Sequence, residues 1–224
     1  MVPFDTSISG LLGPAPQDAR VYVIDDHSEM RKSFYLLLGT VGITTWPFAT
    51  PLEFLGQIDD LPPAPILLDV RMPDLDGVGV MRELNRRQSA WPVILMTAHA
   101  DVAVVVQLMK LGVTECLEKP FELEVAMVAL DRAYALLAKA NAESASAVDT
   151  QRRFGALTPR EIEVIGKLLK GVQNKIVASD LCLIVRTVDM HRAKALKKLR
   201  TRNIAETVAL AHIGHWTPSS VSLT

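Results

Sequence analysis

The stretch VYVIDDHSEM, residues 21–30, places two adjacent aspartates directly behind a short run of β-forming residues. Residues 21–24 are typical of a buried strand, and Ser28 is a residue type that opens helices. Asp25 and Asp26 therefore stand where a strand ends and a helix is about to begin. Because two carboxylates at the end of a buried strand repel each other and lose solvation, the pair indicates a bound cation or a charged partner.

The alternation of strand and helix patterns continues to about residue 138. Further strands are expected at residues 43–46, 65–70, 91–97 and 114–118. Helices are expected after residue 28, after the capping box of TPLEF at residues 50–54, and at about 78–88, 101–111 and 121–138. Five strands alternating with five helices predict an α/β fold, an open doubly wound parallel sheet covered on both faces.

Composition places the chain among globular proteins. It has 224 residues, enough for two ordinary domains, and 49% are hydrophobic, which is ample for a core. No apolar run is long enough to cross a bilayer, and the first twenty residues lack a signal-peptide pattern, so we expect no membrane association and a flexible lead-in over residues 1–19. Cys116 and Cys182 are expected to be free thiols in a cytoplasmic protein.

Charge is distributed unevenly along the chain, although the net charge is only −1. Residues 1–150 carry 11 Lys and Arg against 20 Asp and Glu, whereas residues 151–224 carry 13 against 5. This asymmetry indicates one acidic module and one module suited to a polyanion, although small modules also vary in charge by chance.

The second half of the chain reads as a linker followed by a small helical domain. Residues 139–156 are rich in Ala, Ser and charge, which is typical of a linker or a frayed helical extension. Thr158, Pro159 and Glu161 then form a capping-box pattern at the start of a helix. A short helix near 174–181, a turn and a basic helix from Thr187 complete a predicted all-α helix-turn-helix domain over residues 157–213, with a tail at 214–224.

Reactive residue types gather at one predicted edge of the sheet. Asp25 and Asp26 follow the first strand, and Asp69, Thr97 and Lys119 follow the third, fourth and fifth. The carboxyl ends of parallel strands form a common ligand-binding edge, and converging carboxylates favour Mg²⁺. One carboxylate could then attack a phosphoryl group while the lysine balances charge on its oxygens. His27 and His99 border this edge without metal-ligand spacing, so we expect both to be incidental.

These residues carry a resemblance to a known family. VIDDH, ILLDVRMPDLDG, ILMTAH and LEKPF resemble the receiver domain of two-component response regulators, which is a flavodoxin-like fold. LTPREIEVI, NK and RTVDMHRAKALKKL resemble the LuxR-type DNA-binding domain. Over residues 20–213 the chain looks like a FixJ/NarL-type regulator, closer to the FixJ branch, with a receiver at 20–138.

The resemblance implies roles for the residues at the sheet edge. Asp69 would be the phosphoacceptor, and Asp26 and Asp69 would bind Mg²⁺ directly. Asp25 would act mainly through water, and the backbone carbonyl of Arg71 would be a further metal ligand. Lys119 would contact the phosphoryl oxygens, and Thr97 would be the switch hydroxyl. Pro120 would follow a cis peptide bond.

The resemblance also implies a set of DNA contacts on the last two helices of the motif. Lysines and arginines there would supply phosphate affinity, while fewer side chains near the start of the third helix would read bases. We expect Val188, Ala195, Leu196 and Leu199 on the inner face. The predicted contacts are Asn174, Lys175, Arg186, Thr187, Met190, Arg192, Lys194, Lys197 and Lys198.

The sequence departs from the family pattern in both domains. Relatives carry Tyr or Phe where this chain has Cys116, so the aromatic group that couples phosphorylation to output is missing; whether Tyr134 replaces it is open. Relatives read Leu-Gly-Ile-Ser at the turn, where this chain has Cys182 and Ile184. Loss of the glycine predicts strain at a positive φ, and loss of the serine removes a helix cap. Asp189 stands where many relatives have a base and would face DNA unfavourably, although the FixJ branch often has an acid there.

We interpret the chain as a transcription regulator switched by phosphorylation of Asp69 from a sensor histidine kinase. It would form a homodimer through its receiver, bind double-stranded promoter DNA and act on RNA polymerase. Val104, Val105, Leu108 and Met109 offer apolar material for the dimer face. We expect no enzymatic role beyond the receiver's own phosphorylation and dephosphorylation.

Three alternatives remain open from sequence. A phosphohydrolase would want a second acid where Arg71 stands. A constitutive DNA binder with a static receiver stays open because Cys116 stands where relatives carry the coupling aromatic residue. RNA binding lacks an aromatic stacking platform.

Overall fold

The computed structural model describes residues 18–98 and 102–218. The chain divides into two compact units, residues 1–140 and 141–224, which we describe separately. The expected lead-in lies outside the described residues except for Asp18 and Ala19, and so do His99 and the last six residues of the expected tail.

The first unit contains a parallel sheet of five strands in the order β2-β1-β3-β4-β5. The expected open, doubly wound sheet is therefore confirmed, and each predicted strand lies within about two residues of its observed position. The strands are β1 (Arg20–Ile24), β2 (Thr44–Phe48), β3 (Ile66–Asp69), β4 (Val93–Thr97) and β5 (Glu115–Glu118).

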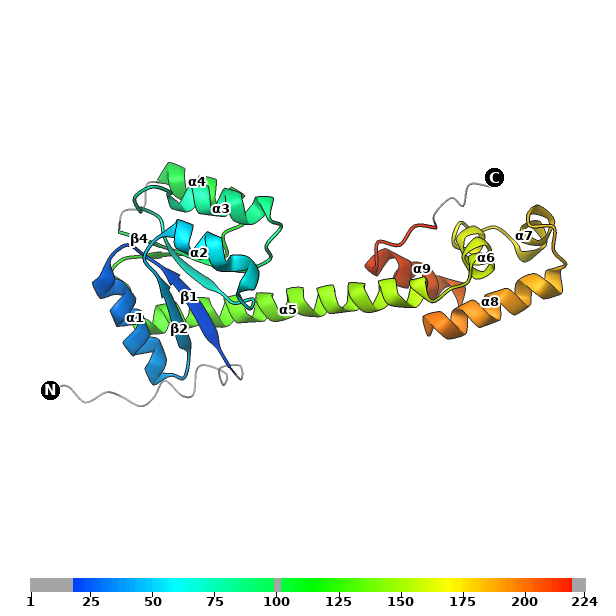
Figure 1. Cartoon of the computed structure of the whole chain (residues 1–224), viewed down its shortest axis with the longest axis horizontal. Coiled ribbons are helices and arrows are strands. Elements are labelled where there is room, and N and C mark those ends of the chain that lie inside the picture. The colour runs from blue at the N-terminus through cyan, green and yellow to red at the C-terminus, as the bar shows by residue number, and fades with distance from the viewer. Residues whose placement is uncertain (1–17, 99–101, 219–224) are drawn as a thin grey trace. The chain divides into compact units, whose positions relative to one another are not determined.

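Helices cover both faces of this sheet (Figure 1). On one face Phe54, Val80 and Leu108 pack against inward-facing strand residues, and on the other face Phe34 and Ala129 do so. Because both faces are buried, the central strands are continuous apolar runs rather than alternating ones. The first face is covered by α2 (Pro51–Gln57), the short 3₁₀ helix η2 (Ile58–Asp60), α3 (Gly77–Arg86) and α4 (Val102–Lys110), and the second by α1 (Ser28–Thr40) and α5 (Leu123–Gly155).

Helix α5 is much longer than the sequence analysis predicts. It ends at Gly155 rather than near residue 138, so most of the expected linker at 139–156 is helical. The linker composition is rich in alanine, the strongest helix former, and holds no proline and no glycine before Gly155. A polar surface does not end a helix when no breaker is present.

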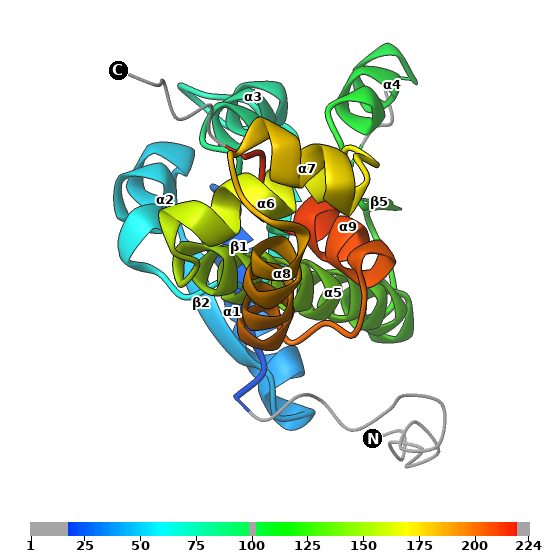
Figure 2. The same ribbon diagram turned by 90° about the vertical axis from the view of Figure 1, so that its right-hand side faces the viewer.

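In its described residues, 141–218, the second unit has four helices after the end of α5, which Figures 1 and 2 show from two sides. The last of them was not predicted, although Asn203 caps it by accepting a hydrogen bond from the Glu206 amide. The helices are α6 (Pro159–Leu169), α7 (Asn174–Asp180), α8 (Val185–Leu199) and α9 (Ile204–Ile213). The predicted capping box of α6 is confirmed at Thr158 and Glu161.

Residues on both sides of the predicted helix-turn-helix segment complete the core of the second unit. Phe154, at the end of α5, is 1% exposed and stacks on Trp216 with ring centroids 4.2 Å apart. Trp216 belongs to the expected tail and Phe154 to the expected linker, so both segments supply apolar packing. No helix in the described residues is long and apolar enough to span a membrane.

Candidate functional site

The parallel sheet brings the predicted reactive residues to one edge. Asp25 directly follows β1, Asp69 and Thr97 end β3 and β4, and Lys119 follows β5. In the register of the sheet Asp69 lies beside Met96, and Thr97 lies beside Glu118. The buried apolar strands end at this edge, and the polar side chains stand directly at or after their ends.

Four side chains at this edge form a compact acidic cluster. Asp25, Asp26, His27 and Asp69 each place a potential ligand atom within 4.8 Å of the others. Asp25 is 0% exposed and Asp69 is 6% exposed, whereas Asp26 is more open to solvent.

His27 was expected to be incidental, and the structure places it inside the cluster. Its Nδ1 lies 2.8 Å from an Asp26 oxygen, and its backbone amide donates to Asp25 Oδ1 over 2.8 Å. Sequence spacing alone did not reveal this contact, because it depends on the tight bend between β1 and α1.

Lys119 is the cation that faces the acidic cluster. Its Nζ lies 2.7 Å from Asp25 Oδ2 and 3.4 Å from Asp69 Oδ2, with only 12% of the side chain exposed. The Lys119–Pro120 peptide bond is cis, as the resemblance implied. A lysine held between two carboxylates can also face an anionic group bound to either of them.

Burial raises the pKa of Asp69 above its ordinary value. The Lys119 ammonium and a hydrogen bond from the Arg71 backbone oppose this shift, while the charge of Asp25 adds to it. Burial and the neighbouring like charge both disfavour the ionised form of Asp69, and the positive charge of Lys119 offsets them only in part.

The donor set of the cluster fits Mg²⁺. This cation prefers oxygen ligands and takes one or two carboxylates together with waters. Asp25, Asp26 and Asp69 offer carboxylate oxygens within 4.8 Å of one another. Their three negative charges exceed the single positive charge of Lys119, so a further cation would be stabilised there. The proposed Arg71 carbonyl ligand stays a prediction.

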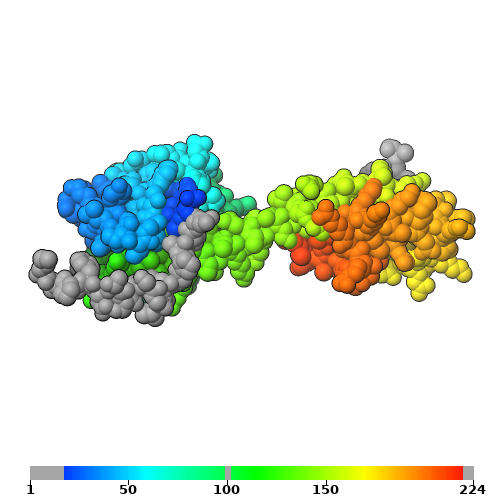
Figure 3. All heavy atoms as spheres, turned by 90° about the horizontal axis from the view of Figure 1, so that it is seen from below, coloured from blue at the N-terminus to red at the C-terminus, as the bar shows by residue number. Residues whose placement is uncertain are grey.

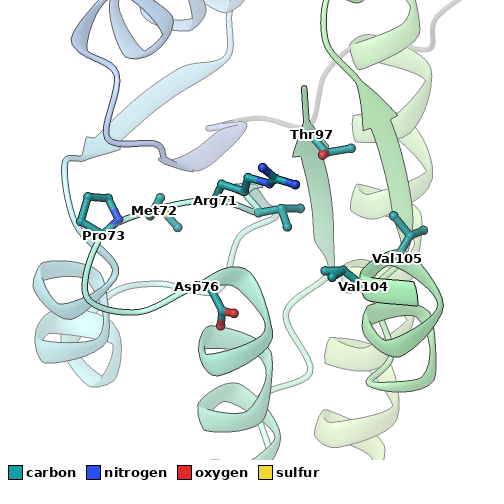
Figure 4. A pocket seen from close by; sticks show the side chains of 8 residues that line it. Arg71, Met72, Pro73, Asp76, Thr97, Val104 and Val105 are labelled. Atoms are coloured by element: carbon teal, nitrogen blue, oxygen red, sulfur yellow. The ribbon is translucent and has the colours of Figure 1, made fainter. Parts of the chain in front are cut away.

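A cavity of about 420 Å³ is lined by the loop after β3, the end of β4 and part of α4 (Figure 4). Thr97 is 1% exposed and lines it, together with Arg71 and with Val104 and Val105 from α4. Figure 4 shows the Arg71 side chain extending between the loop after β3 and Thr97. The cavity therefore lies between the end of β4 and the first turn of α4.

The two residues that bear on the missing aromatic group lie in different places. Cys116 is half-buried on β5 and packs against the core beneath α4. The Tyr134 hydroxyl donates to the Arg20 carbonyl at the start of β1, and burial raises the pKa of Tyr134. Because the start of β1 is the opposite end of the strand from Asp25, Tyr134 does not replace the missing aromatic side chain.

In the second unit, α8 presents part of the predicted DNA-contact set to solvent. Val188, Ala195 and Leu199 are buried as predicted, and Leu196 is half-buried. Helix α8 begins at Val185, two residues before the predicted start. The exposed members of the set are Lys175, Arg186, Met190, Lys194, Lys197 and Lys198, while Thr187 is half-buried.

Three members of the set are held by neighbouring side chains. Asn174 donates to Asp189 Oδ1 over 2.7 Å, and Arg192 Nη1 lies 3.8 Å from the same oxygen. Lys198 Nζ lies 2.7 Å from Glu161 Oε2, and the Glu161 side chain is only 4% exposed. Their roles in DNA contact stay predictions, and Lys198 has a structural partner that the sequence did not reveal.

The turn between α7 and α8 shows both of the expected departures. Cys182 has a φ of 53°, in the left-handed region that favours glycine. Ile184 stands at the N-cap of α8 without a side-chain cap. The turn therefore contributes less stability than a glycine and serine pair would provide.

Comparison with known protein families matches both units. The model described as "Response regulator receiver domain" matches residues 21–131. The model described as "Bacterial regulatory proteins, luxR family" matches residues 155–211.

Characterised relatives match across nearly their whole length. The chain is 35% identical to the transcriptional regulatory protein FixJ of Bradyrhizobium diazoefficiens, over 85% of this chain and 93% of that protein. It is 32% identical to the tetrathionate response regulatory protein TtrR of Salmonella typhimurium, over 85% and 90%. Among solved structures, the response regulator StyR has a TM-score of 0.75 at 29% identity, covering 87% of this chain and 98% of that one.

Proposed function

The chain belongs to the response regulators that join a receiver domain to a LuxR-type DNA-binding domain, and we propose that phosphorylation of Asp69 controls its binding to DNA. It is a transcriptional regulator of the FixJ-like kind. The observation that supports Asp69 is its place in the cluster: it is nearly buried, faces Lys119 and lies beside two further carboxylates.

The proposed phosphorylation is a direct transfer to the Asp69 carboxylate. A carboxylate oxygen attacks the phosphorus of a phosphohistidine on a sensor kinase, the P–N bond breaks, and the imidazole leaves with a proton from solvent. Lys119 would balance the charge of the phosphoryl oxygens, being already 3.4 Å from Asp69. Asp26 and Asp69 would hold Mg²⁺ directly and Asp25 mainly through water, and the ion would supply charge neutralisation in the pocket.

The receiver would carry out this reaction only on itself. Water would later hydrolyse the acyl phosphate and return Asp69 to its resting form. This role differs from turnover of a separate substrate, and the chain as a whole acts through DNA rather than as an enzyme.

The proposed switch runs from Asp69 through Thr97 to α4. A phosphoryl group on Asp69 would attract the Thr97 hydroxyl at the end of the neighbouring strand, and α4 lies across the cavity from it. Small shifts at such a site are amplified when a packed element has two arrangements.

We propose that α4 also supplies the surface for a second copy of the chain. The earlier choice of Leu108 for this surface was wrong, because Leu108 is 0% exposed and belongs to the core. Val102, Val106 and Met109 are instead 73%, 46% and 50% exposed on α4. Two copies would present two DNA-binding units to double-stranded promoter DNA. The bound dimer would then contact RNA polymerase. Both steps would take place in the cytoplasm, where that DNA lies.

The proposal can be tested on the full chain. We would incubate it with Mg²⁺ and a small acyl phosphate, and measure its intact mass and its oligomeric state together. The expected result is a gain of one phosphoryl group with a shift to dimer, both lost in Asp69→Asn. Lys119→Met should also lose phosphorylation, whereas Asp131→Asn, an exposed change on α5, should leave both readouts intact.

A second candidate function is a constitutive DNA binder with a static receiver. Cys116 favours it, because no aromatic side chain stands at that position to follow Thr97. Phosphorylation without any change of oligomeric state or DNA affinity would support this second candidate. Absence of phosphorylation with DNA binding intact would do the same.

A further inference from the structure

Helix α8 contains one acidic residue, Asp189, in a strongly basic sequence. Arg186, Arg192, Lys194, Lys197 and Lys198 all lie on the same helix. In the space-filling view the orange atoms of α8 form much of the visible surface of the second unit (Figure 3). A carboxylate on a surface that approaches phosphates lowers affinity for DNA, so Asp189 needs another explanation.

Asp189 makes two contacts through a single carboxylate oxygen. Asn174, the first residue of α7, donates from Nδ2 to Asp189 Oδ1 over 2.7 Å. Arg192, one turn further along α8, has its Nη1 3.8 Å from the same oxygen. The arginine offsets the charge of the acid, and the hydrogen bond ties the start of α7 to α8.

The carboxylate also determines which way the Asn174 amide points. An ionised carboxylate can only accept hydrogen bonds, whereas an amide group has a donor end and an acceptor end. Asn174 must therefore turn its Nδ2 toward Asp189 and its Oδ1 away. Without this partner the amide could rotate by half a turn and present the opposite pattern to a ligand.

The hydrogen bond matters more here because the connecting turn is weakly built. Neither Gln173 before α7 nor Ile184 before α8 caps its helix with a side chain. Cys182 within the turn has the positive φ described above. Across the described parts of this domain, Asn174–Asp189 is the one side-chain hydrogen bond that joins α7 to α8.

We propose that Asp189 is a positioning residue for sequence discrimination: it orients Asn174 and sets α7 against α8, at a cost in general affinity for DNA. This inference rests on the DNA-binding function stated above. A phosphate-contacting lysine would change specific and non-specific affinity together and leave their ratio unchanged, whereas Asp189 would change the ratio.

The test uses the full chain after treatment with Mg²⁺ and a small acyl phosphate. Wild type first selects its preferred sequence from a library of random duplexes, and affinities are then measured for that duplex and for a scrambled one. In Asp189→Asn we expect binding to the scrambled duplex to tighten about two- to five-fold, because one negative charge is lost. We expect the ratio of specific to scrambled affinity to fall about ten-fold.

A matched control separates charge from position. Asp180→Asn removes one acid from an ion pair with Lys167 in the same domain, on the far end of α7 from Asn174. It should tighten binding to both duplexes equally and leave the ratio unchanged. Asn174→Ala should lower the ratio as Asp189→Asn does, and the double variant should be no worse than Asn174→Ala alone.

Two results with these variants would overturn the inference. One is an unchanged ratio in Asp189→Asn with a melting temperature equal to that of wild type. The other is additive losses in the double variant, which would mean that the two residues act independently. Wild type that binds duplex DNA without selecting a sequence would overturn the inference alone, whereas wild type that binds no duplex at all would contradict the DNA-binding function itself.

Discussion

At the scale of single residues, Thr45 on β2 is out of keeping with its surroundings. It is 5% exposed, and its hydroxyl makes no hydrogen bond within the described residues. A buried polar group without a partner costs free energy, and valine has nearly the same shape. We therefore expect Thr45→Val to raise the free energy of unfolding of the receiver by about 1 kcal/mol.

The measurement for Thr45→Val is urea unfolding of the full chain, followed by a signal from the receiver. Thr44→Val is the matched control, because Thr44 is exposed on the same strand and gains the same strand preference. Equal effects of the two changes would show that strand preference, rather than the buried hydroxyl, explains the gain.

Lys197 and Lys198 are adjacent lysines with different surroundings. Lys197 is exposed, whereas Lys198 pairs with the nearly buried Glu161. Lys197→Ala should reduce the slope of log affinity for DNA against log salt concentration by about one, without changing the stability of the unit. Lys198→Ala should destabilise the DNA-binding unit by about 1–2 kcal/mol, less than a fully buried pair because its side chain is 36% exposed.

Both lysine variants are checked by thermal unfolding and by DNA affinity at several salt concentrations. If Lys198→Ala lowered the salt slope and left stability unchanged, Lys198 would be a phosphate contact and its bond to Glu161 would be of little consequence.

At the scale of elements, the start of α6 depends on an ionised Glu161. Burial opposes its charge, but hydrogen bonds from Lys198 and from Thr158 outweigh that effect and lower the pKa of Glu161. A carboxylate with a lowered folded pKa stabilises the fold fully above its unfolded pKa. This contribution is lost as the pH falls through the folded pKa.

We therefore expect the DNA-binding unit to lose stability as the pH falls below about 4.3, the ordinary value for glutamate. In Glu161→Gln this part of the pH dependence should disappear, because glutamine does not titrate. Thermal unfolding of both proteins between pH 3 and 7 is the measurement, and parallel curves would contradict the prediction.

The end of α5 is a structural part of the DNA-binding unit. Phe154 is buried against Trp216, and a Cβ on Gly214 would lie 2.4 Å from the Thr150 side chain. Phe154→Ala should destabilise this unit by about 3–5 kcal/mol, as for other buried phenylalanines. Val148→Ala, at a 66% exposed position of the same helix, should have almost no effect in the same unfolding experiment.

Local signals in the sequence predicted many of these elements. The strand runs, the caps at Thr50 and Thr158 and the edge that gathers Asp25, Asp69 and Lys119 all follow from short-range patterns and from the rule for parallel sheets. The length of α5 did not follow, because a polar, alanine-rich segment is compatible with both linker and helix.

Contacts between distant residues were the main part that the sequence did not reveal. Asn174–Asp189 and Glu161–Lys198 join positions 15 and 37 residues apart. Charge type alone placed Lys198 among the DNA contacts, because its partner is identified only when α6 and α8 pack together. His27 was missed for a similar reason, since its contact depends on a bend rather than on spacing.

At the scale of the whole molecule, the two units have opposite charge and distinct tasks. The acidic receiver holds the cluster around Asp69, and the basic unit presents α8. In the function proposed above, a phosphoryl group on the first unit would influence the second through association of two copies, since a dimer would bind two half-sites together and gain affinity from both.

The surface for this association can be tested at Val106 on α4. Val106 is 46% exposed, so Val106→Asp should fold normally while placing a charge in a proposed apolar contact. We expect phosphorylation by a small acyl phosphate to be unchanged and the dimer to weaken at least ten-fold, because burying an unpaired carboxylate costs several kcal/mol. Sedimentation of the phosphorylated protein measures this change.

Leu36→Asp, at a 67% exposed apolar position on α1, is the control and should leave the dimer intact. If Leu36→Asp weakened the dimer and Val106→Asp did not, the two copies would associate through α1 rather than α4.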